Sequence, residues 1–221
     1  MYLEEHTISG LHAFLDPILK RHALRGGRAL DLGAGSGTLA ARLHELGFEV
    51  TAVDLNSERF KANIPFVQLD LNNPDFCSLG DRLFDFVTAV EVIEHLESPT
   101  AFLRNIRSLL KPDGFALITT PNMDNTPSRF RFLLTGKLHM MDEKVPNHIS
   151  PIFYDLFIRQ YLPRGGLKLV EHHFFPEKGY KVSHPYYSWA LCLLARLLPG
   201  NTLFGDIHVF VLKPMDGTYK P

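Results

Sequence analysis

Apolar residues follow two alternating patterns along the chain, one typical of helices and one typical of strands. Leu11, Leu15 and Ile18 recur at helical spacing, and a later amphipathic stretch stops at Gly47, a common helix-ending residue. The stretches that we interpret as helices cover residues 10–23, 39–46, 99–110 and 151–162, with a short helix or turn at 57–62. The runs that we interpret as strands cover residues 28–32, 48–53, 65–70, 81–90, 115–120, 167–175 and 206–212. This alternation predicts an α/β fold built on a parallel sheet with right-handed crossovers.

Two segments depart from the alternation. The pattern loosens over residues 121–150, which we interpret as a lid or insertion. Residues 184–199 are strongly apolar between two prolines and predict an apolar helical insertion. No uncharged apolar run reaches the roughly 18 residues that a membrane-spanning helix requires. We therefore expect residues 1–221 to form one domain, in line with their number.

A glycine-rich turn connects the first predicted strand to the helix that follows it. Gly33, Gly35 and Gly37 occupy alternate positions, and Asp31 lies just before them. Glycine adopts dihedral angles that other residues avoid, and it lets a ligand approach the bare backbone. Asp54 ends the second strand, 21 residues after Gly33, where a carboxylate can accept the hydroxyls of a ribose. The turn therefore predicts a nucleotide-binding corner of a doubly wound sheet.

The spacing of the glycines distinguishes between kinds of nucleotide site. A dinucleotide site has the pattern G-x-G-x-x-G, whereas the third glycine here comes one residue earlier. The segment Asp31–Gly37 resembles the D-L-G-x-G-x-G turn of class I S-adenosylmethionine-dependent methyltransferases. Asp54, Asp70–Leu71 and Leu109–Phe115 match other motifs of that family. The resemblance covers the whole chain and implies a doubly wound, mostly parallel seven-stranded sheet with helices on both faces and an antiparallel final strand.

The resemblance also implies how the cofactor, S-adenosyl-L-methionine, is held. Asp31 would orient its amino group, Asp54 its ribose diol and Asp70 its adenine amino group. The glycine turn would pack against the methionine half, two leucines against the adenine ring, and Glu91 would shape the pocket. The complete predicted set of cofactor-binding residues is Asp31, Gly33, Ala34, Gly35, Gly37, Asp54, Leu55, Asp70, Leu71 and Glu91.

The segment Glu91-Val-Ile-Glu-His95 follows the fourth strand and carries the candidate catalytic residues, His95 and Glu94. It is similar to a segment of the quinone-biosynthesis O-methyltransferases. It also looks like the segment with which the terminal 2′-O-methyltransferases of small RNAs help bind a divalent metal ion.

Three interpretations of this segment stay open. In the first, His95 is the general base, because a histidine with an ordinary pKa of about 6.5 can accept the proton of a hydroxyl. In the second, a divalent metal ion binds to the tentative ligand set Glu91, Glu94, His95 and His148. In the third, Glu94 and His95 only cap the following helix.

Charge and cysteine content narrow the class of protein further. The chain has 23 Lys and Arg against 24 Asp and Glu, a net charge of −1, which argues against a nucleic-acid-binding surface. Its two cysteines cannot form a disulfide framework, and its first residues lack the basic and apolar pattern of a signal peptide. We therefore expect a cytoplasmic protein.

Residues 129–141 interleave basic residues with a dense apolar set. A helix over this range would present Phe130, Leu133 and Met141 on one face, with basic side chains available to lipid phosphates. In quinone O-methyltransferases an insertion here is associated with membrane contact, which implies a lipophilic substrate. For residues 129–141 we prefer an ordinary lid helix that packs on the domain. Peripheral contact with the inner membrane face, through residues 129–141 or 186–198, is the alternative.

Together these features predict an S-adenosylmethionine-dependent methyltransferase that O-methylates a small-molecule or lipid-linked acceptor. Metal-assisted methylation of an RNA 3′ end or a diol is one alternative. A non-catalytic module that binds S-adenosylmethionine is an alternative of another class.

Overall fold

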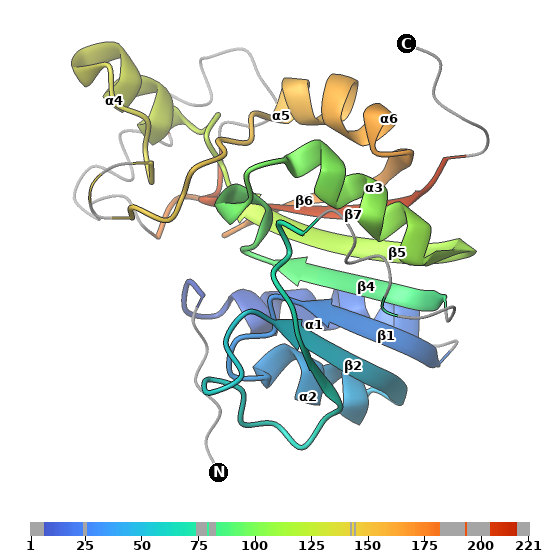
Figure 1. Cartoon of the computed structure of the whole chain (residues 1–221). Helices are drawn as coiled ribbons and strands as arrows, with labels where there is room; N and C mark the ends of the chain where they lie inside the picture. Colours follow the sequence, from blue (N-terminus) through green and yellow to red (C-terminus); the bar gives the residue numbers. More distant parts are fainter. Residues whose placement is uncertain are drawn as a thin grey trace.

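The computed structural model describes residues 7–23, 26–73, 79, 83–141, 143, 145–181, 193 and 204–215. Its centre is a seven-stranded sheet with the order β3-β2-β1-β4-β5-β7-β6 (Figure 1). The strands are β1 (Gly27–Leu32), β2 (Phe48–Asp54), β3 (Phe66–Gln68), β4 (Phe84–Val90), β5 (Leu110–Pro121), β6 (Leu167–Phe175) and β7 (Ile207–Pro214). The first five strands are parallel, and β7 runs antiparallel to both β5 and β6. The predicted seven-stranded, mostly parallel sheet with an antiparallel final strand is confirmed.

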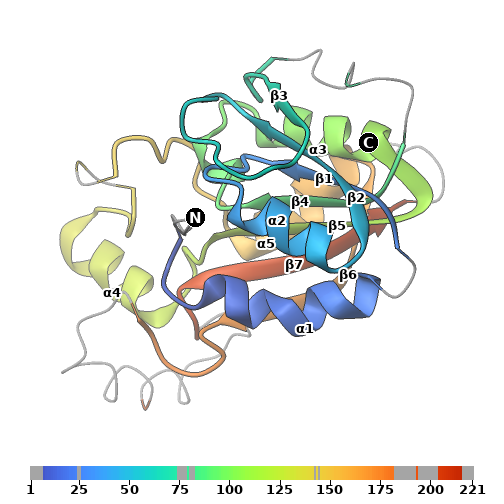
Figure 2. The same ribbon diagram turned by 90° about the horizontal axis from the view of Figure 1, so that it is seen from below.

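Helices cover both faces of the sheet. On one face lie α1 (Leu11–Ala23) and α2 (Thr38–Glu45) (Figure 2). Their leucines pack with Val50, Phe86 and Val209. On the other face lie α3 (Pro99–Leu109) and the helical segment from α5 (Tyr154–Leu156) through η3 (Phe157–Tyr161) to α6 (Leu162–Arg164). Strands with helices on both faces bury both sides, which explains their near-continuous apolar sequences.

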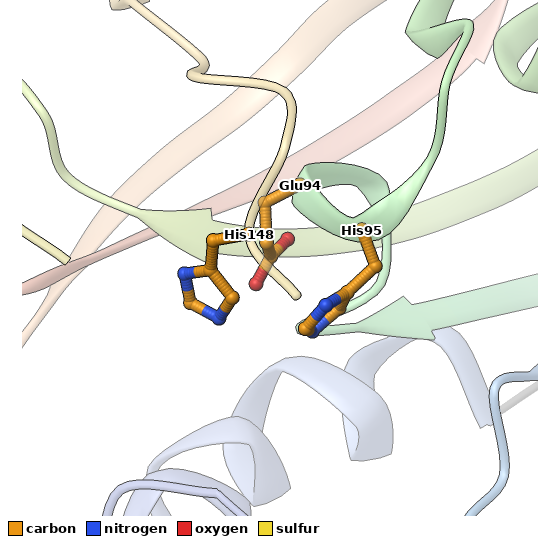
Figure 3. Close-up of side chains that lie close together, drawn as sticks. All are labelled: Glu94, His95 and His148. Atoms are coloured by element: carbon orange, nitrogen blue, oxygen red, sulfur yellow. The ribbon is translucent and has the colours of Figure 1, made fainter. Parts of the chain in front are cut away.

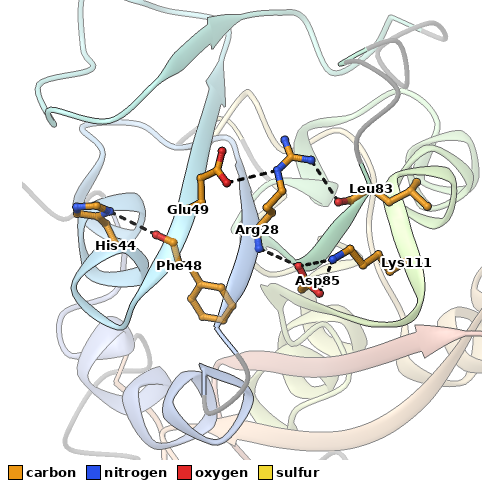
Figure 4. Close-up of polar contacts among 7 residues, drawn as sticks. All are labelled: Arg28, His44, Phe48, Glu49, Leu83, Asp85 and Lys111. Carbon is orange, nitrogen blue, oxygen red and sulfur yellow. Dashed lines mark hydrogen bonds and ion pairs between the residues drawn. The ribbon is translucent and has the colours of Figure 1, made fainter.

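Polar contacts at the amino ends of β1, β2 and β4 hold the sheet together opposite the glycine turn (Figure 4). The Asp85 carboxylate accepts hydrogen bonds from the Arg28 backbone N–H and from Lys111 Nζ, both at 2.8 Å. The Arg28 guanidinium lies 3.8 Å from the Glu49 carboxylate and donates to the Leu83 carbonyl. These contacts tie the start of β5 to β1, although the pairing of β4 and β5 shifts register between Phe84 and Phe86.

Several helices and strands begin or end at other residues than predicted. The strand predicted at 115–120 starts earlier, because residues 111–114 also belong to β5, where the register shift between β4 and β5 accommodates them. The helix predicted from residue 151 starts at Tyr154, whose backbone N–H donates to the Asp124 carboxylate. The helix α4 spans Thr126–Thr135 and ends at Gly136, which adopts the left-handed conformation with φ 66°. The prediction of a helical face that continues to Met141 is therefore wrong.

The segment 184–199 lies outside the described residues, apart from Leu193, which is exposed. The prediction of an apolar helix there stays a prediction. No helix in the described part of the chain is long and apolar enough to cross a bilayer.

Candidate active site

A cavity of about 460 Å³ opens at the carboxyl ends of β1, β2 and β4, where open α/β sheets bind their ligands. Its volume lies in the usual range for small-molecule sites. All the predicted cofactor-binding residues except Gly37 line it, together with His95. Residues that the sequence did not single out also line it: Thr7, His12, Ser36, Thr38, Leu39, Arg59, Leu69, Asn72, Val90, Val92 and Leu96.

The glycine turn at the floor of the cavity requires its glycines. Gly33, Gly35 and Gly37 have φ values of 72°, 55° and 90°, which other residues rarely adopt. A Cβ atom on Gly33 would lie 2.4 Å from Val92 Cγ2, and one on Gly37 would lie 2.5 Å from Ala62 Cβ. Gly37 does not line the cavity, but it packs closely against Phe60 and Ala62 of the loop after β2.

Asp54 anchors this turn from the end of β2. Its carboxylate accepts hydrogen bonds from the backbone N–H groups of Gly35, at 2.8 Å, and Asn56, at 2.9 Å. The carboxylate is thereby fixed at the wall of the cavity, in the position expected for a group that binds a ribose diol.

Asp31 is buried at the end of β1, with only 2% of its surface exposed. One carboxylate oxygen accepts a hydrogen bond from the Thr88 hydroxyl at 2.7 Å, whereas the other, Oδ2, has no partner among the described residues. Burial raises the pKa of Asp31 to about 7, and the nearby Asp54 carboxylate adds to the shift. A buried carboxylate with an unused oxygen fits a site for a cationic amino group, because such a partner offsets the cost of burial.

Glu91 lies at the turn after β4 in a strained conformation, with a φ of 56°. Its backbone N–H donates to the Thr119 hydroxyl, and that hydroxyl in turn donates to Glu91 Oε1 at 2.9 Å. Burial raises the pKa of Glu91 to about 7, although the hydrogen bond from Thr119 acts in the opposite direction. The pair holds the Glu91 side chain on the cofactor side of the turn.

Glu94, His95 and His148 form a compact cluster beside the cavity (Figure 3). One ligand atom of each lies within 4.8 Å of the others. His95 donates from Nδ1 to the Asn147 carbonyl at 2.9 Å, and His148 donates from Nδ1 to the Met140 carbonyl at 2.8 Å. A carbonyl can only accept, so Nε2 of each neutral ring carries the lone pair.

Glu94 is fully buried in η2 (Ile93–His95), and neither of its carboxylate oxygens has a hydrogen-bond partner in the described part of the structure. Burial raises its pKa well above the ordinary value, and the Glu91 carboxyl adds to the shift. The Glu94 carbonyl accepts from the backbone N–H groups of Ile149 and Ser150, both at 2.9 Å. This contact brings the His148 segment to the cluster.

The four tentative metal ligands do not all lie together in the structure. Of the four tentative metal ligands, Glu94, His95 and His148 converge, whereas Glu91 lies outside this cluster and bonds to Thr119. Asn122, near the end of β5, is 1% exposed, and its amide donates to the Phe204 and Gly205 carbonyls, so it braces the scaffold. Thr7 and His12 reach the cavity only because α1 folds over the sheet, and no local sequence pattern marks them.

Comparisons with known proteins agree with this site. A family model described as a methyltransferase domain matches residues 3–172. The chain is 37% identical over 138 residues to a ubiquinone biosynthesis O-methyltransferase of Xanthomonas campestris pv. campestris (strain B100), a match that covers 57% of each chain. It is 32% identical over 175 residues to the protein of that name from Xanthomonas euvesicatoria pv. vesicatoria (strain 85-10), covering 73% of this chain and 72% of the relative.

Solved structures share the fold at lower identity. A SAM-dependent methyltransferase from Archaeoglobus fulgidus has a TM-score of 0.62 at 20% identity and covers 92% of both chains. The 1,6-didemethyltoxoflavin-N1-methyltransferase of Burkholderia thailandensis, solved with S-adenosylhomocysteine, has a TM-score of 0.58 at 20% identity. It covers 93% of this chain and 78% of that chain.

The fold and the site define a class I, Rossmann-like methyltransferase that uses S-adenosylmethionine as its cofactor. The chain belongs to the methyltransferase-domain family, and its first curated relative is matched over little more than half of that relative's length. The unused oxygen of Asp31, the carboxylate of Asp54 and the crowded glycine turn together fit this cofactor.

Proposed function

We propose that this methyltransferase transfers the methyl group to an oxygen atom of a small or lipid-linked acceptor, with His95 as the general base. One observation carries the proposal: His95 lines the same cavity as the cofactor-binding residues, with its ring oriented by the Asn147 carbonyl. An imidazole held in this way presents Nε2 as a proton acceptor.

When bound, S-adenosylmethionine supplies an electrophilic methyl group for in-line transfer to a nucleophile. A hydroxyl is a poor nucleophile until its proton is removed, and His95 Nε2 accepts that proton. The Glu94 carboxyl lies within 4.8 Å of a nitrogen of the same ring, on the side away from solvent. In this proposal the acceptor binds against His95, and Asp31, Asp54 and Asp70, which line the same cavity, hold the cofactor.

The named relatives support oxygen as the acceptor atom. Two proteins at 32% and 37% identity carry the name ubiquinone biosynthesis O-methyltransferase. We infer from this name that the acceptor is a hydroxylated ring of quinone type, free or lipid-linked.

The test is a methyl-transfer assay with labelled S-adenosylmethionine against catechols, hydroxylated quinone precursors and lipid extracts. His95→Ala and His95→Gln are expected to lower turnover by about 100-fold or more, because a general base typically contributes 10²–10⁴-fold. Their affinity for S-adenosylhomocysteine is expected to stay unchanged, with His44→Ala as an exposed histidine control. Full turnover in both His95 variants would contradict the general-base role. Intact cofactor binding without methyl transfer to any acceptor would instead favour a non-catalytic binding module.

The cluster of Glu94, His95 and His148 supports a second candidate, metal-assisted methyl transfer. Two imidazole Nε2 atoms and a carboxylate are a donor set for divalent transition metal ions, and second-shell carbonyls that fix Nδ1–H are typical of such ligands. Burial lowers the pKa of His148, and the neighbouring His95 acts in the same direction, which keeps the ring neutral. A bound ion would satisfy the orphaned Glu94 carboxylate and could acidify a hydroxyl of a diol or an RNA 3′ end.

Chelation separates the two candidates. If the cluster binds an essential ion, EDTA abolishes turnover, Mg²⁺, Mn²⁺ or Zn²⁺ restores it, and His148→Ala loses both turnover and metal binding by calorimetry. Turnover that is indifferent to EDTA, with a fully active His148→Ala, would exclude the metal and leave His95 as the base.

A further inference from the structure

The glycine turn has few backbone donors left for a ligand. Four of its N–H groups already donate within the protein, at 2.8–3.0 Å. Gly33 and Ala34 donate to the Val53 carbonyl, Gly35 donates to Asp54, and Gly37 donates to the Ala34 carbonyl. The hydroxyls of Ser36 and Thr38 bond to each other at 2.8 Å. These four N–H groups are not available to an anionic ligand, so side-chain donors on the cavity wall would strengthen its binding.

The negative charges around the cavity make hydrogen-bond donors for an anionic ligand more important. Four carboxyl-bearing residues line it: Asp31, Asp54, Asp70 and Glu91. The cofactor carries an α-carboxylate on its methionine half, the half that packs against the glycine turn. A carboxylate among carboxylates is unfavourable unless hydrogen-bond donors or a positive charge face it.

The segment just before and within the first turn of α1 provides such donors. His12 lines the cavity with only 5% of its surface exposed. Thr7 also lines the cavity, and its buried hydroxyl has no hydrogen-bond partner in the part of the chain that the structure describes. Both residues share the cavity wall with Gly35, Ser36 and Thr38.

Contacts that do not involve the cavity hold this segment in place. Leu11 and Leu15 are fully buried and pack in the same core cluster as Leu43 of α2. Lys181 Nζ donates to the Ser9 carbonyl at 2.7 Å, and the Leu11 N–H donates to the Ile8 carbonyl at 3.0 Å. His12 is therefore positioned before any ligand arrives, as a preorganised binding group must be.

We propose that the His12 imidazole and the Thr7 hydroxyl form the receptor for the α-carboxylate of S-adenosylmethionine. Arg59 is the competing cationic side chain on the cavity wall, but it is exposed on the loop after β2 and stays mostly solvated. The proposal rests on the use of this cofactor and not on the identity of the acceptor, so failure of the O-methylation hypothesis leaves it intact.

Calorimetry with two ligands tests the proposal on the full chain. S-adenosylhomocysteine carries the carboxylate, whereas S-adenosyl-3-thiopropylamine keeps the amine and lacks the carboxylate. The ratio of their dissociation constants reports the carboxylate alone. His12→Ala is expected to lower this selectivity ratio roughly tenfold, the loss of one charge-assisted hydrogen bond, and Thr7→Val is expected to lower it a few-fold. Arg59→Ala, the matched control, is expected to leave the ratio unchanged.

The outcomes are separable. Equal weakening of both ligands in His12→Ala would show a packing role and overturn the proposal, as would an unchanged ratio. A collapse of the ratio in Arg59→Ala would overturn it in favour of Arg59. His12→Gln keeps an N–H donor and is expected to retain part of the selectivity. It replaces His12→Ala if thermal unfolding shows that the alanine variant is not folded.

Discussion

Asp31 and Asp54 lie at the ends of neighbouring strands, yet their surroundings differ. Asp54 accepts hydrogen bonds from the backbone N–H groups of Gly35 and Asn56. Asp31 accepts one from the Thr88 hydroxyl, and among the described residues its second oxygen has no hydrogen-bond partner. A buried carboxylate that lacks donors favours its protonated form, which explains why the pKa of Asp31 is raised to about 7. The ionised form of Asp31, the residue predicted to bind the cofactor's amino group, is therefore costly to the cofactor-free fold.

This cost predicts a pH dependence of stability. Because the pKa of Asp31 is higher in the folded than in the unfolded chain, the folded state binds more protons between about pH 4 and pH 7. Its contribution is full below about pH 4 and is lost as the pH rises through about 7, with a slope of at most about 1.4 kcal/mol per pH unit. Urea unfolding of the cofactor-free protein at several pH values measures it. Asp31→Asn should remove this component, and an identical pH profile in the variant would contradict the prediction.

At the scale of elements, the junction between β1 and α2 shows how packing and backbone conformation act together. Gly37 is the N-cap of α2 with a φ of 90°. A Cβ atom added to it would lie 2.5 Å from Ala62 Cβ and 2.8 Å from Phe60 Cε2. Gly47 ends the turn after α2 with a similar φ of 93°, but an added Cβ would meet nothing within 4 Å. A substitution at Gly47 therefore reports the cost of the left-handed backbone alone, whereas one at Gly37 adds the cost of steric crowding.

The matched variants Gly37→Ala and Gly47→Ala should differ in stability. Each incurs a penalty of about 1 kcal/mol for the left-handed backbone. Gly37→Ala should lose about 1–3 kcal/mol more, because its Cβ would displace Ala62 and Phe60. Chemical denaturation gives both values. Equal losses would show that the loop after β2 yields freely, and would contradict the tight packing of the turn.

Other elements show where local patterns mislead. Residues 111–114 carry the composition of a turn but lie within β5, because Asp85 and Lys111 bridge the register shift that accommodates them. The strand β7, last in sequence, lies between β5 and β6 and leaves β6 at the edge of the sheet. Strand order depends on contacts between distant segments, which a local hydrophobic pattern does not encode.

At the scale of the whole molecule, α4 projects away from the sheet in both views (Figures 1 and 2). Its last turn exposes three consecutive apolar side chains: Phe132 is 55% exposed, and Leu133 and Leu134 are each 77% exposed. Exposed Arg129 and Lys137 flank them. A basic and apolar tip of this kind suits the headgroup region of an anionic membrane, and we propose that it docks there to reach a lipid-linked acceptor.

Flotation with liposomes that contain anionic lipid checks this surface. The double variant Leu133→Glu/Leu134→Glu should lose most of its binding, while its free energy of unfolding changes by less than about 0.5 kcal/mol because both side chains are exposed. Lys137→Glu should weaken binding mainly at low salt. Wild-type protein that does not float would leave α4 as an ordinary part of the lid and the acceptor as a water-soluble molecule.

The sequence by itself determined the class of fold and the cofactor corner. Strand and helix periodicities follow from local backbone geometry, and the positive φ values of Gly33, Gly35 and Gly37 require glycine wherever that turn is built. Asp31 and Asp54 lie at or near the carboxyl ends of their strands, so their place at the cavity could be predicted from their position in the chain.

Only the tertiary structure decided what gathers around this corner. It brought His148 to Glu94 and His95 across more than fifty residues through the backbone contacts of Ile149 and Ser150. It placed Thr7 and His12 on the cavity wall and separated Glu91 from the cluster that its sequence motif suggested. These arrangements depend on how α1 and the loop after α4 pack against the sheet, and that packing involves contacts between residues far apart in the chain.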